Sequence, residues 1–155
     1  MNLYKHTQIG YLMLVVTLAV LALFAWAQIT ARLEPPSYYS GTNFAITSIM
    51  ALILFIFASF TTLTASIDEN CLRIKFGCGI FWKTLPLSEI ASAMAVKNHW
   101  YYGWGIRLWL WPKMWIYNVS GFDAIEIIMR NGKIYRIGTN DPSGLEAAVK
   151  RAINP

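Results

Sequence analysis

Charged residues are scarce in this chain, and two long stretches contain none. Only 14% of the 155 residues are charged and 56% are hydrophobic, whereas a soluble domain usually carries about 25% charged residues. No Asp, Glu, Lys or Arg occurs between Lys5 and Arg32 or between Glu34 and Asp68. A helix crosses the hydrocarbon layer of a membrane with about 20 residues. The two stretches therefore predict a transmembrane helical hairpin over residues 1–64.

The first apolar stretch also has features of a secretory signal peptide. Lys5 gives it a positive start, and Ala25-Trp26-Ala27 resembles a small-x-small cleavage site. Its apolar region is longer than an ordinary signal core, so we expect the helix to be retained. Cleavage would leave the second helix with the same orientation.

Basic residues are concentrated after the second apolar stretch. From Ala65 onward there are eleven basic and seven acidic residues, whereas the connector 32–41 has one of each and contains Pro35-Pro36. Positive charges near helix ends stay on the cytoplasmic side. We therefore expect a multi-pass protein of the cytoplasmic (inner) membrane with both termini in the cytoplasm, and we expect Tyr38 and Tyr39 near the outer interface. The basic excess is too small and too dispersed to predict nucleic acid as a partner.

Cysteine and histidine are also scarce, which restricts metal chemistry. The two cysteines are seven residues apart, and the chain has only two histidines. These cannot supply the four Cys or His ligands of a structural zinc site. We expect no metal and no other cofactor.

No group of residues has the spacing of a catalytic site. General acid–base catalysis needs two titratable groups held together, and nothing in the spacing of Glu89, His99 or Glu126 brings two such groups together. Ser120 lies in "NVSG", which is not a nucleophile elbow. The expected function is non-enzymatic, and a membrane enzyme with an unrecognised site remains the least favoured alternative.

The segment from residue 65 to 155 is predicted to form a mainly β domain that ends in a helix. Period-two alternation, typical of strands, marks "CLRIKFG", "IFWKTL", "ASAMAVKN" and both sides of Asn131-Gly132, which predicts a type I′ turn. The last segment, "NDPSGLEAAVKRAI", predicts a helix capped by Asp141. Its apolar stripe consists of Leu145, Ala148, Val149 and Ala152.

Five of the seven tryptophans lie between Trp100 and Gly121, and their pattern predicts a β-hairpin. Charged residues, glycines and Pro112 interrupt the run, so it cannot span a membrane, and its glycines do not form a dinucleotide-binding loop. A turn at Pro112-Lys113 pairs Leu110 with Trp115. It directs Trp104, Ile106, Leu108 and Leu110 toward the core. The opposite face is then an exposed apolar tip. Its candidate binding residues are Arg107, Trp109, Trp111, Lys113, Met114 and Ile116.

Three interpretations of this tip are open. Its tryptophans fit a membrane interface, where tryptophan is favoured and Arg107 and Lys113 reach headgroups. They also fit docking on a protein partner or on the helical hairpin of the same chain. The third interpretation is that the register differs and that the tryptophans belong to the core.

Four segments of the chain resemble small bacterial membrane proteins with a pleckstrin-homology-like cytoplasmic domain. They are "WYYGWGIR", "YNVSGFDAIEI", "GKIYRIGT" and "DPSGLEAAV". The resemblance covers residues 63–153. The chain departs from it at His99 and in "LWLWPKMW". The resemblance implies a seven-stranded bent sheet or split barrel closed by a C-terminal helix. Members of the wider fold that bind phosphoinositides use a basic loop between the first two strands, but here that loop is the acidic Asp68-Glu69-Asn70.

The sequence therefore predicts a membrane-anchored interaction or scaffolding domain at the cytoplasmic face. Its expected partners are the lipid bilayer and a membrane or cytoplasmic protein. The main alternative is direct recognition of an anionic lipid by the domain.

Overall fold

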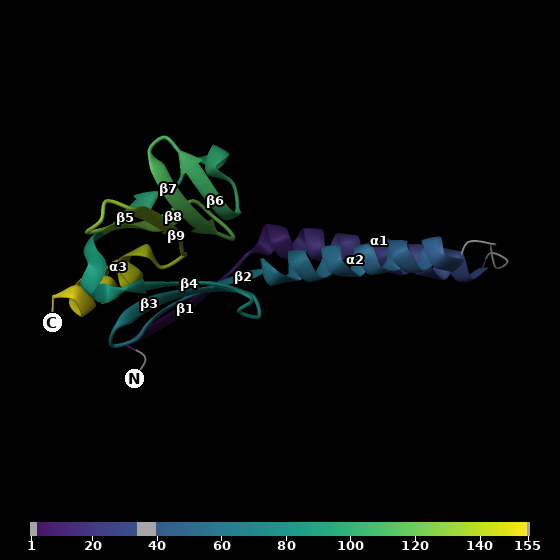
Figure 1. Ribbon diagram of the computed structural model, residues 1–155, viewed down its shortest axis with the longest axis horizontal. Coiled ribbons are helices and arrows are strands. Elements are labelled where there is room, and N and C mark those ends of the chain that lie inside the picture. The colour runs from purple at the N-terminus through teal and green to yellow at the C-terminus, as the bar shows by residue number, and fades with distance from the viewer. Residues whose placement is uncertain (1–2, 34–39, 155) are drawn as a thin grey trace.

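A pair of long helices projects from a β-sheet body in the computed structural model, which describes residues 3–33 and 40–154 (Figure 1). Helices α1 (Tyr11–Leu33) and α2 (Ser40–Ser59) lie side by side, and Gln28 Nε2 donates to Thr47 Oγ1 at 3.0 Å. In the described part of the chain, only Tyr11–Ala31 is long and apolar enough to cross a membrane, because the apolar stretch Phe44–Ser59 is shorter. Tyr38 and Tyr39, expected near an interface, lie outside the described residues.

The helices are inserted into a β-hairpin that the sequence did not predict. Strand β1 (Tyr4–Ile9) precedes α1, and it pairs antiparallel with β2 (Thr62–Ile67), which follows α2. Gly10 alone separates β1 from α1, and its N–H donates to the Thr61 carbonyl at 2.6 Å. The predicted boundary after residue 64 falls inside β2. The β body therefore includes residues on both sides of the helices, and no flexible linker separates it from them.

The body consists of two sheets. Sheet A has the order β1-β2-β3-β4, with β3 at Cys71–Phe76 and β4 at Phe81–Pro86. Sheet B has the order β5-β8-β9-β7-β6, in which β7 and β9 are parallel and the other neighbours are antiparallel. Its strands are β5 (Ile90–Lys97), β6 (Gly105–Leu110), β7 (Lys113–Asn118), β8 (Asp123–Met129) and β9 (Ile134–Gly138). All seven predicted strands are present, together with β1 and β2.

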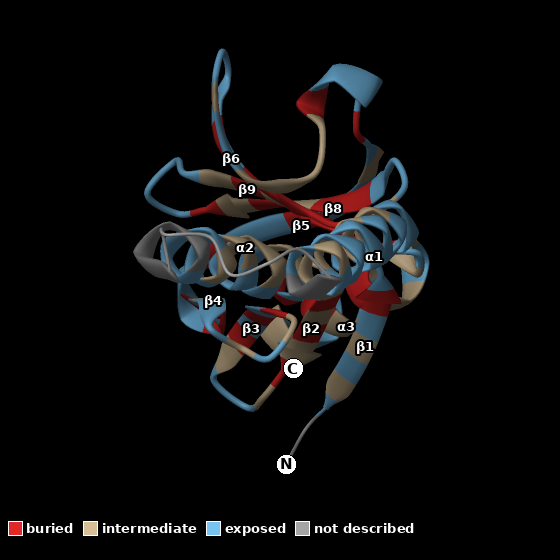
Figure 2. Cartoon of the chain, turned by 90° about the vertical axis from the view of Figure 1, so that its right-hand side faces the viewer, coloured by how far each residue is buried: buried red, intermediate tan, exposed pale blue. Residues whose placement is uncertain are grey.

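The main core lies between the two sheets, as the view along the helices shows (Figure 2). It is built from alternate residues of the strands because successive side chains point to opposite faces of a sheet. Helix α3 (Pro142–Ile153) adds the buried Leu145 and Val149 to this core, as predicted. Asp141 caps the helix by accepting a hydrogen bond from the Gly144 N–H. The expected split barrel is not formed, because the sheets are not closed into a barrel and β4 and β6 remain edge strands.

The β8–β9 turn lies at the predicted place with a different conformation. Gly132 has a φ of 80°, and its N–H donates to the Met129 carbonyl at 2.9 Å. Asn131 does not have a positive φ, so the type I′ assignment was wrong. The loop has three residues between Met129 and Lys133, which close it through a backbone hydrogen bond. A three-residue loop needs positive φ at its last position only.

Candidate functional site

The tryptophan hairpin is present as β6 and β7, with its turn one residue earlier than predicted. Short 3-10 helices precede β5 and β6: η1 (Leu87–Glu89) and η2 (Trp100–Tyr102). Leu110 lies opposite Lys113 and Leu108 opposite Trp115, so Trp111 and Pro112 form the turn. This shift changes each partner by two positions and leaves the two faces of the hairpin as predicted. The two faces are nevertheless covered differently from the prediction.

Three of the six candidate binding residues lie in a second, smaller core. Met114 and Ile116 are each only 1% exposed and pack with Tyr102, and Trp109 is half-buried against them. Their predicted exposure was wrong because η2 folds over this face of sheet B. The ring centroids of Tyr102 and Trp109 are 4.8 Å apart. A buried position of this kind stabilises the hairpin and leaves Met114 and Ile116 inaccessible to a partner.

An ion pair holds η2 in place over this face. Arg136 on β9 forms a salt bridge of 2.8 Å with Glu126 on β8, and both side chains are mostly buried. The guanidinium carbon of Arg136 lies 5.5 Å from the centroid of the Tyr102 ring. A cation over an aromatic face is attracted by the electrons of the ring. The second core is therefore closed by a charged layer.

The other three candidate residues are exposed and do not form one cluster. Trp111, at the turn, is 91% exposed. Arg107 lies opposite Ile116 on the η2 side, and its Nε donates to the Trp104 carbonyl at 3.2 Å. Lys113 is on the opposite face, beside Leu110. Trp104, predicted to be inside, is only half-buried.

The face predicted to enter the core is buried at the base of the hairpin and uncovered toward its turn. Tyr117 is buried in the main core and Ile106 packs against it. Farther along the same face, Leu108 is 42% exposed and Leu110 74% exposed. Sheet A does not extend beneath this part of the hairpin. An apolar surface is therefore left open where the two sheets fail to close.

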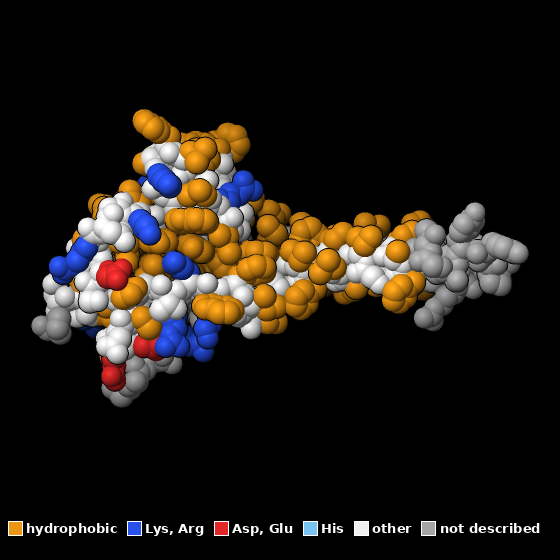
Figure 3. All heavy atoms as spheres, in the orientation of Figure 1, with side chains coloured by type: hydrophobic (Ala, Val, Ile, Leu, Met, Phe, Trp, Pro, Cys, Tyr) orange, Lys and Arg blue, Asp and Glu red, His pale blue; other side chains and the backbone are white. Residues whose placement is uncertain are grey.

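The uncovered face continues into a groove between β4 and β6. The groove has a volume of about 270 Å³ and is lined by Ile80, Phe81, Trp82, Ile106 and Tyr117. Trp82, on edge strand β4, is 67% exposed. Figure 3 shows hydrophobic side chains gathered over the β6–β7 hairpin and in the space between it and sheet A. We call this groove, together with Leu108, Leu110 and Trp115, the open groove.

The chemistry of the open groove is that of an apolar binding surface with few charges. Burial, together with the neighbouring Tyr135, raises the pKa of Tyr117 to about 12, so its phenol is neutral at physiological pH. Lys83 Nζ lies 5.7 Å from the centroid of the Tyr135 ring at the inner side of β4. Edge strands also present unpaired backbone N–H and C=O groups. The groove can bind an apolar segment and hydrogen-bond to its backbone.

Strand β4 was not predicted to form part of a binding surface. The signal was the adjacent Phe81-Trp82, which places large apolar side chains on both faces of one strand.

Comparisons with known protein families and with curated proteins find no match for this chain. Among the described residues, no three His, Cys, Asp or Glu side chains are grouped so that they could hold a metal ion.

Proposed function

We propose that this chain is a non-enzymatic, membrane-anchored interaction module whose open groove binds an extended apolar segment of a protein partner. The observation that carries the proposal is the exposed apolar face of Leu108, Leu110 and Trp115, which continues into the groove lined by Trp82. Large exposed apolar patches are typical of interaction sites. The bound segment adds a strand to β6 or β4, and its alternate side chains enter the groove, as in other cases of strand addition.

The pairing of β1 with β2 supports a membrane anchor of two helices. These strands flank the helical pair and lie in one sheet, so they must be on the same side of a membrane. If α1 crosses the bilayer, α2 must cross it back. Its 20 residues span about 30 Å as a helix, close to the hydrocarbon thickness, and its apolar stretch Phe44–Ser59 forms most of that length. The basic excess of the β body favours the cytoplasmic side for both termini.

The direction of the β6–β7 hairpin favours a protein over a lipid at its turn. In Figure 1 the hairpin rises away from α1 and α2, and its turn lies at the top of the view. Trp111 and Lys113 are therefore carried away from the end of the body that meets the membrane. A protein partner reaches this turn without any tilt of the body.

Copurification in mild detergent tests the proposal. Leu108→Asp places a charge in the open groove, and we expect it to abolish retention of a stoichiometric protein partner. The matched control is Ala91→Asp, an exposed position on β5, which should retain the partner. Both variants should keep the melting temperature of the wild type because both positions are on the surface. Equal retention by the two variants contradicts the proposal.

A further inference from the structure

The outward face of sheet A carries a basic depression close to the helices. The depression has a volume of about 380 Å³, and its lining includes Lys5, Thr64, Ser66, Asp68, Arg73 and Lys75. The strand register brings these residues together. Ser66 on β2 lies between Lys5 on β1 and Arg73 on β3. In the row nearer the helices, Thr64 lies opposite Lys75. Three cations and two hydroxyl groups thus share one surface with a single carboxylate.

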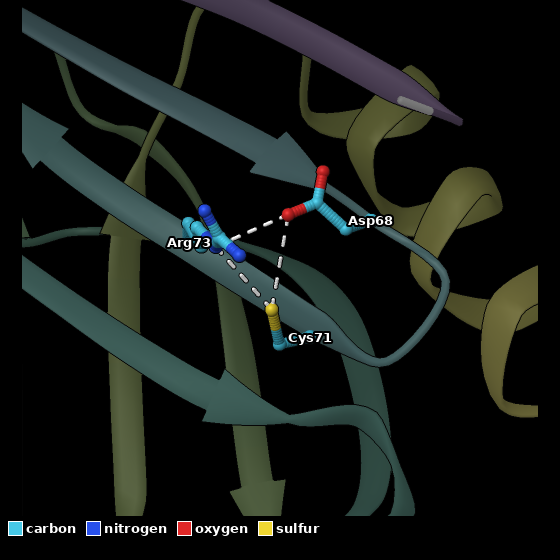
Figure 4. A network of polar contacts seen from close by, with 3 residues as sticks. All are labelled: Asp68, Cys71 and Arg73. Atoms are coloured by element: carbon cyan, nitrogen blue, oxygen red, sulfur yellow. Dashed lines mark hydrogen bonds and ion pairs between the residues drawn. The ribbon is translucent and has the colours of Figure 1, made fainter. Parts of the chain in front are cut away.

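The carboxylate neutralises only one of the three cations. Arg73 Nε is 3.1 Å from Asp68 Oδ2 and also donates to the Cys71 thiol at 3.4 Å (Figure 4). These contacts fix the arginine at the far side of the depression. Neither Lys5 nor Lys75 has an acidic partner within residues 3–33 and 40–154. The two lysines therefore remain available to an anion.

The distance of these lysines from the end of α2 is comparable to the thickness of the headgroup layer of a bilayer. Gly77 is packed so closely against Ser59, the last residue of α2, that a Cβ atom on it would lie 2.6 Å from the Ser59 carbonyl. Lys75 precedes Gly77 by two residues, about 7 Å along a strand. The headgroup layer adds about 5–8 Å to each side of the hydrocarbon core. The side chain of Lys75 lies within reach of this layer, and that of Lys5 lies one row farther away.

The sign of the charge also changes along this face, from basic near the helices to acidic farther from them. The acidic turn Asp68-Glu69 lies at the end of β2 away from α2, and the lysines lie between it and the helices. In Figure 3, basic side chains on the lower surface are nearer the helices than the acidic ones. Trp82 lies opposite Lys75 on the same face, and tryptophan is favoured at membrane interfaces. The acidic turn is thus directed away from the layer that would repel it.

We propose that this face of sheet A binds the phosphate of an anionic membrane lipid, with Lys5 and Lys75 as the charged contacts. The hydroxyl of Ser66 supplies an additional donor to the phosphate oxygens, and that of Thr64 supplies one when it accepts from Thr7 Oγ1, 2.9 Å away. Because β1 and β2 continue into the helices without a linker, the bound lipid fixes the orientation of the body on the membrane. The inference rests on the proposed membrane anchor and adds a lipid site on the outward face of sheet A, which adjoins the open groove at Trp82.

Lipid titration of the full-length chain tests the site. The chain is purified in a non-ionic detergent, and binding of dioctanoyl phosphatidylglycerol is followed by native mass spectrometry. A basic residue near an anionic lipid contributes about 1 kcal/mol, which is about five-fold in affinity. We expect Lys5→Gln/Lys75→Gln to bind on the order of 25-fold more weakly, and the control Lys97→Gln/Lys133→Gln to bind like the wild type. All four lysines are accessible, so both variants should remain folded.

Three results would overturn the lipid site. These are equal affinities of the two double variants, equal binding of dioctanoyl phosphatidylcholine, and displacement of the lipid by millimolar inorganic phosphate. The last would assign the site to a soluble anion. Alkaline carbonate treatment of membranes separates this inference from the anchor. If carbonate extracts the wild-type chain from the membrane, the anchor itself is contradicted. If the chain resists extraction but the lysine variants bind the lipid as tightly as the wild type, only the lipid site is contradicted.

Discussion

Tyr4 and Asp141 are joined by a hydrogen bond between the two ends of the chain. Tyr4 Oη donates to Asp141 Oδ2 at 3.0 Å, and Asp141 Oδ1 accepts from the Gly144 N–H at the start of α3. Burial of Tyr4 and its contact with Asp141 raise the pKa of the phenol. His6 contacts Asn140 beside this pair. The strand before the first helix is therefore attached to the cap of the last helix.

Tyr4→Phe removes this hydrogen bond and should destabilise the β body. Hydrogen bonds to charged groups contribute about 1.5–3 kcal/mol, and the Tyr4–Asp141 pair is only partly buried, so we expect a loss near the lower value. Thermal unfolding in detergent measures it. Tyr11→Phe is the control, because Tyr11 is exposed and should tolerate the change. A Tyr4→Phe protein as stable as the wild type would show that the bond contributes nothing.

The helical pair should be replaceable by a short turn. Gly10 and Thr61 are hydrogen-bonded through their backbones, so an Asn-Gly turn in place of residues 11–60 can join β1 to β2 without strain. We expect this protein to unfold cooperatively in water, as monitored by circular dichroism. Residues 65–155 alone lack β1 and half of β2 and should not. Cooperative unfolding of that fragment would contradict the role assigned to β1.

Gly132→Val should destabilise the β8–β9 hairpin through the backbone alone. Nothing lies within 4 Å of a Cβ atom added at Gly132, but its φ of 80° is unfavourable for a β-branched residue. The expected cost is about 1 kcal/mol or more. Gly132→Asn should cost less, because asparagine tolerates positive φ better. Equal melting temperatures of the two variants would mean that the turn does not need this conformation.

Met114→Ala should destabilise the protein far more than Trp111→Ser. Met114 is buried in the second core, and truncation of a buried methionine typically costs about 2–5 kcal/mol. Trp111 is almost fully exposed, so its replacement should leave the unfolding free energy nearly unchanged. Chemical denaturation of the two variants compares them directly. A larger loss for Trp111→Ser would contradict both the burial of Met114 and the exposure of Trp111.

Local sequence patterns predicted most of the strands, whereas long-range packing determines which faces of those strands are buried. Alternation located both arms of the tryptophan hairpin and assigned their residues to the correct pair of faces. It could not indicate which face is covered, because η2 covers Met114 and sheet A ends short of Leu110. Neither the cover by η2 nor the extent of sheet A can be inferred from the sequence of the hairpin alone.

Strand β1 could not be predicted for a related reason. Its inward-facing residues include His6 and Gln8, so it lacks an apolar face. It forms because β2, on the far side of the helical pair, supplies a partner edge. The end of the apolar run also concealed β2, since Leu63 and Ala65 read as a continuation of the second helix.

Photo-crosslinking from neighbouring positions of β6 in intact membranes tests the central claim most directly. A photoreactive residue at Leu108 or Leu110 faces the open groove, whereas one at Arg107 faces the η2 side of the same strand. We predict a discrete protein adduct of the same mass from positions 108 and 110, and none from position 107. Adducts of equal yield from all three positions, or adducts with lipid alone, would contradict the claim that the open groove binds a protein segment.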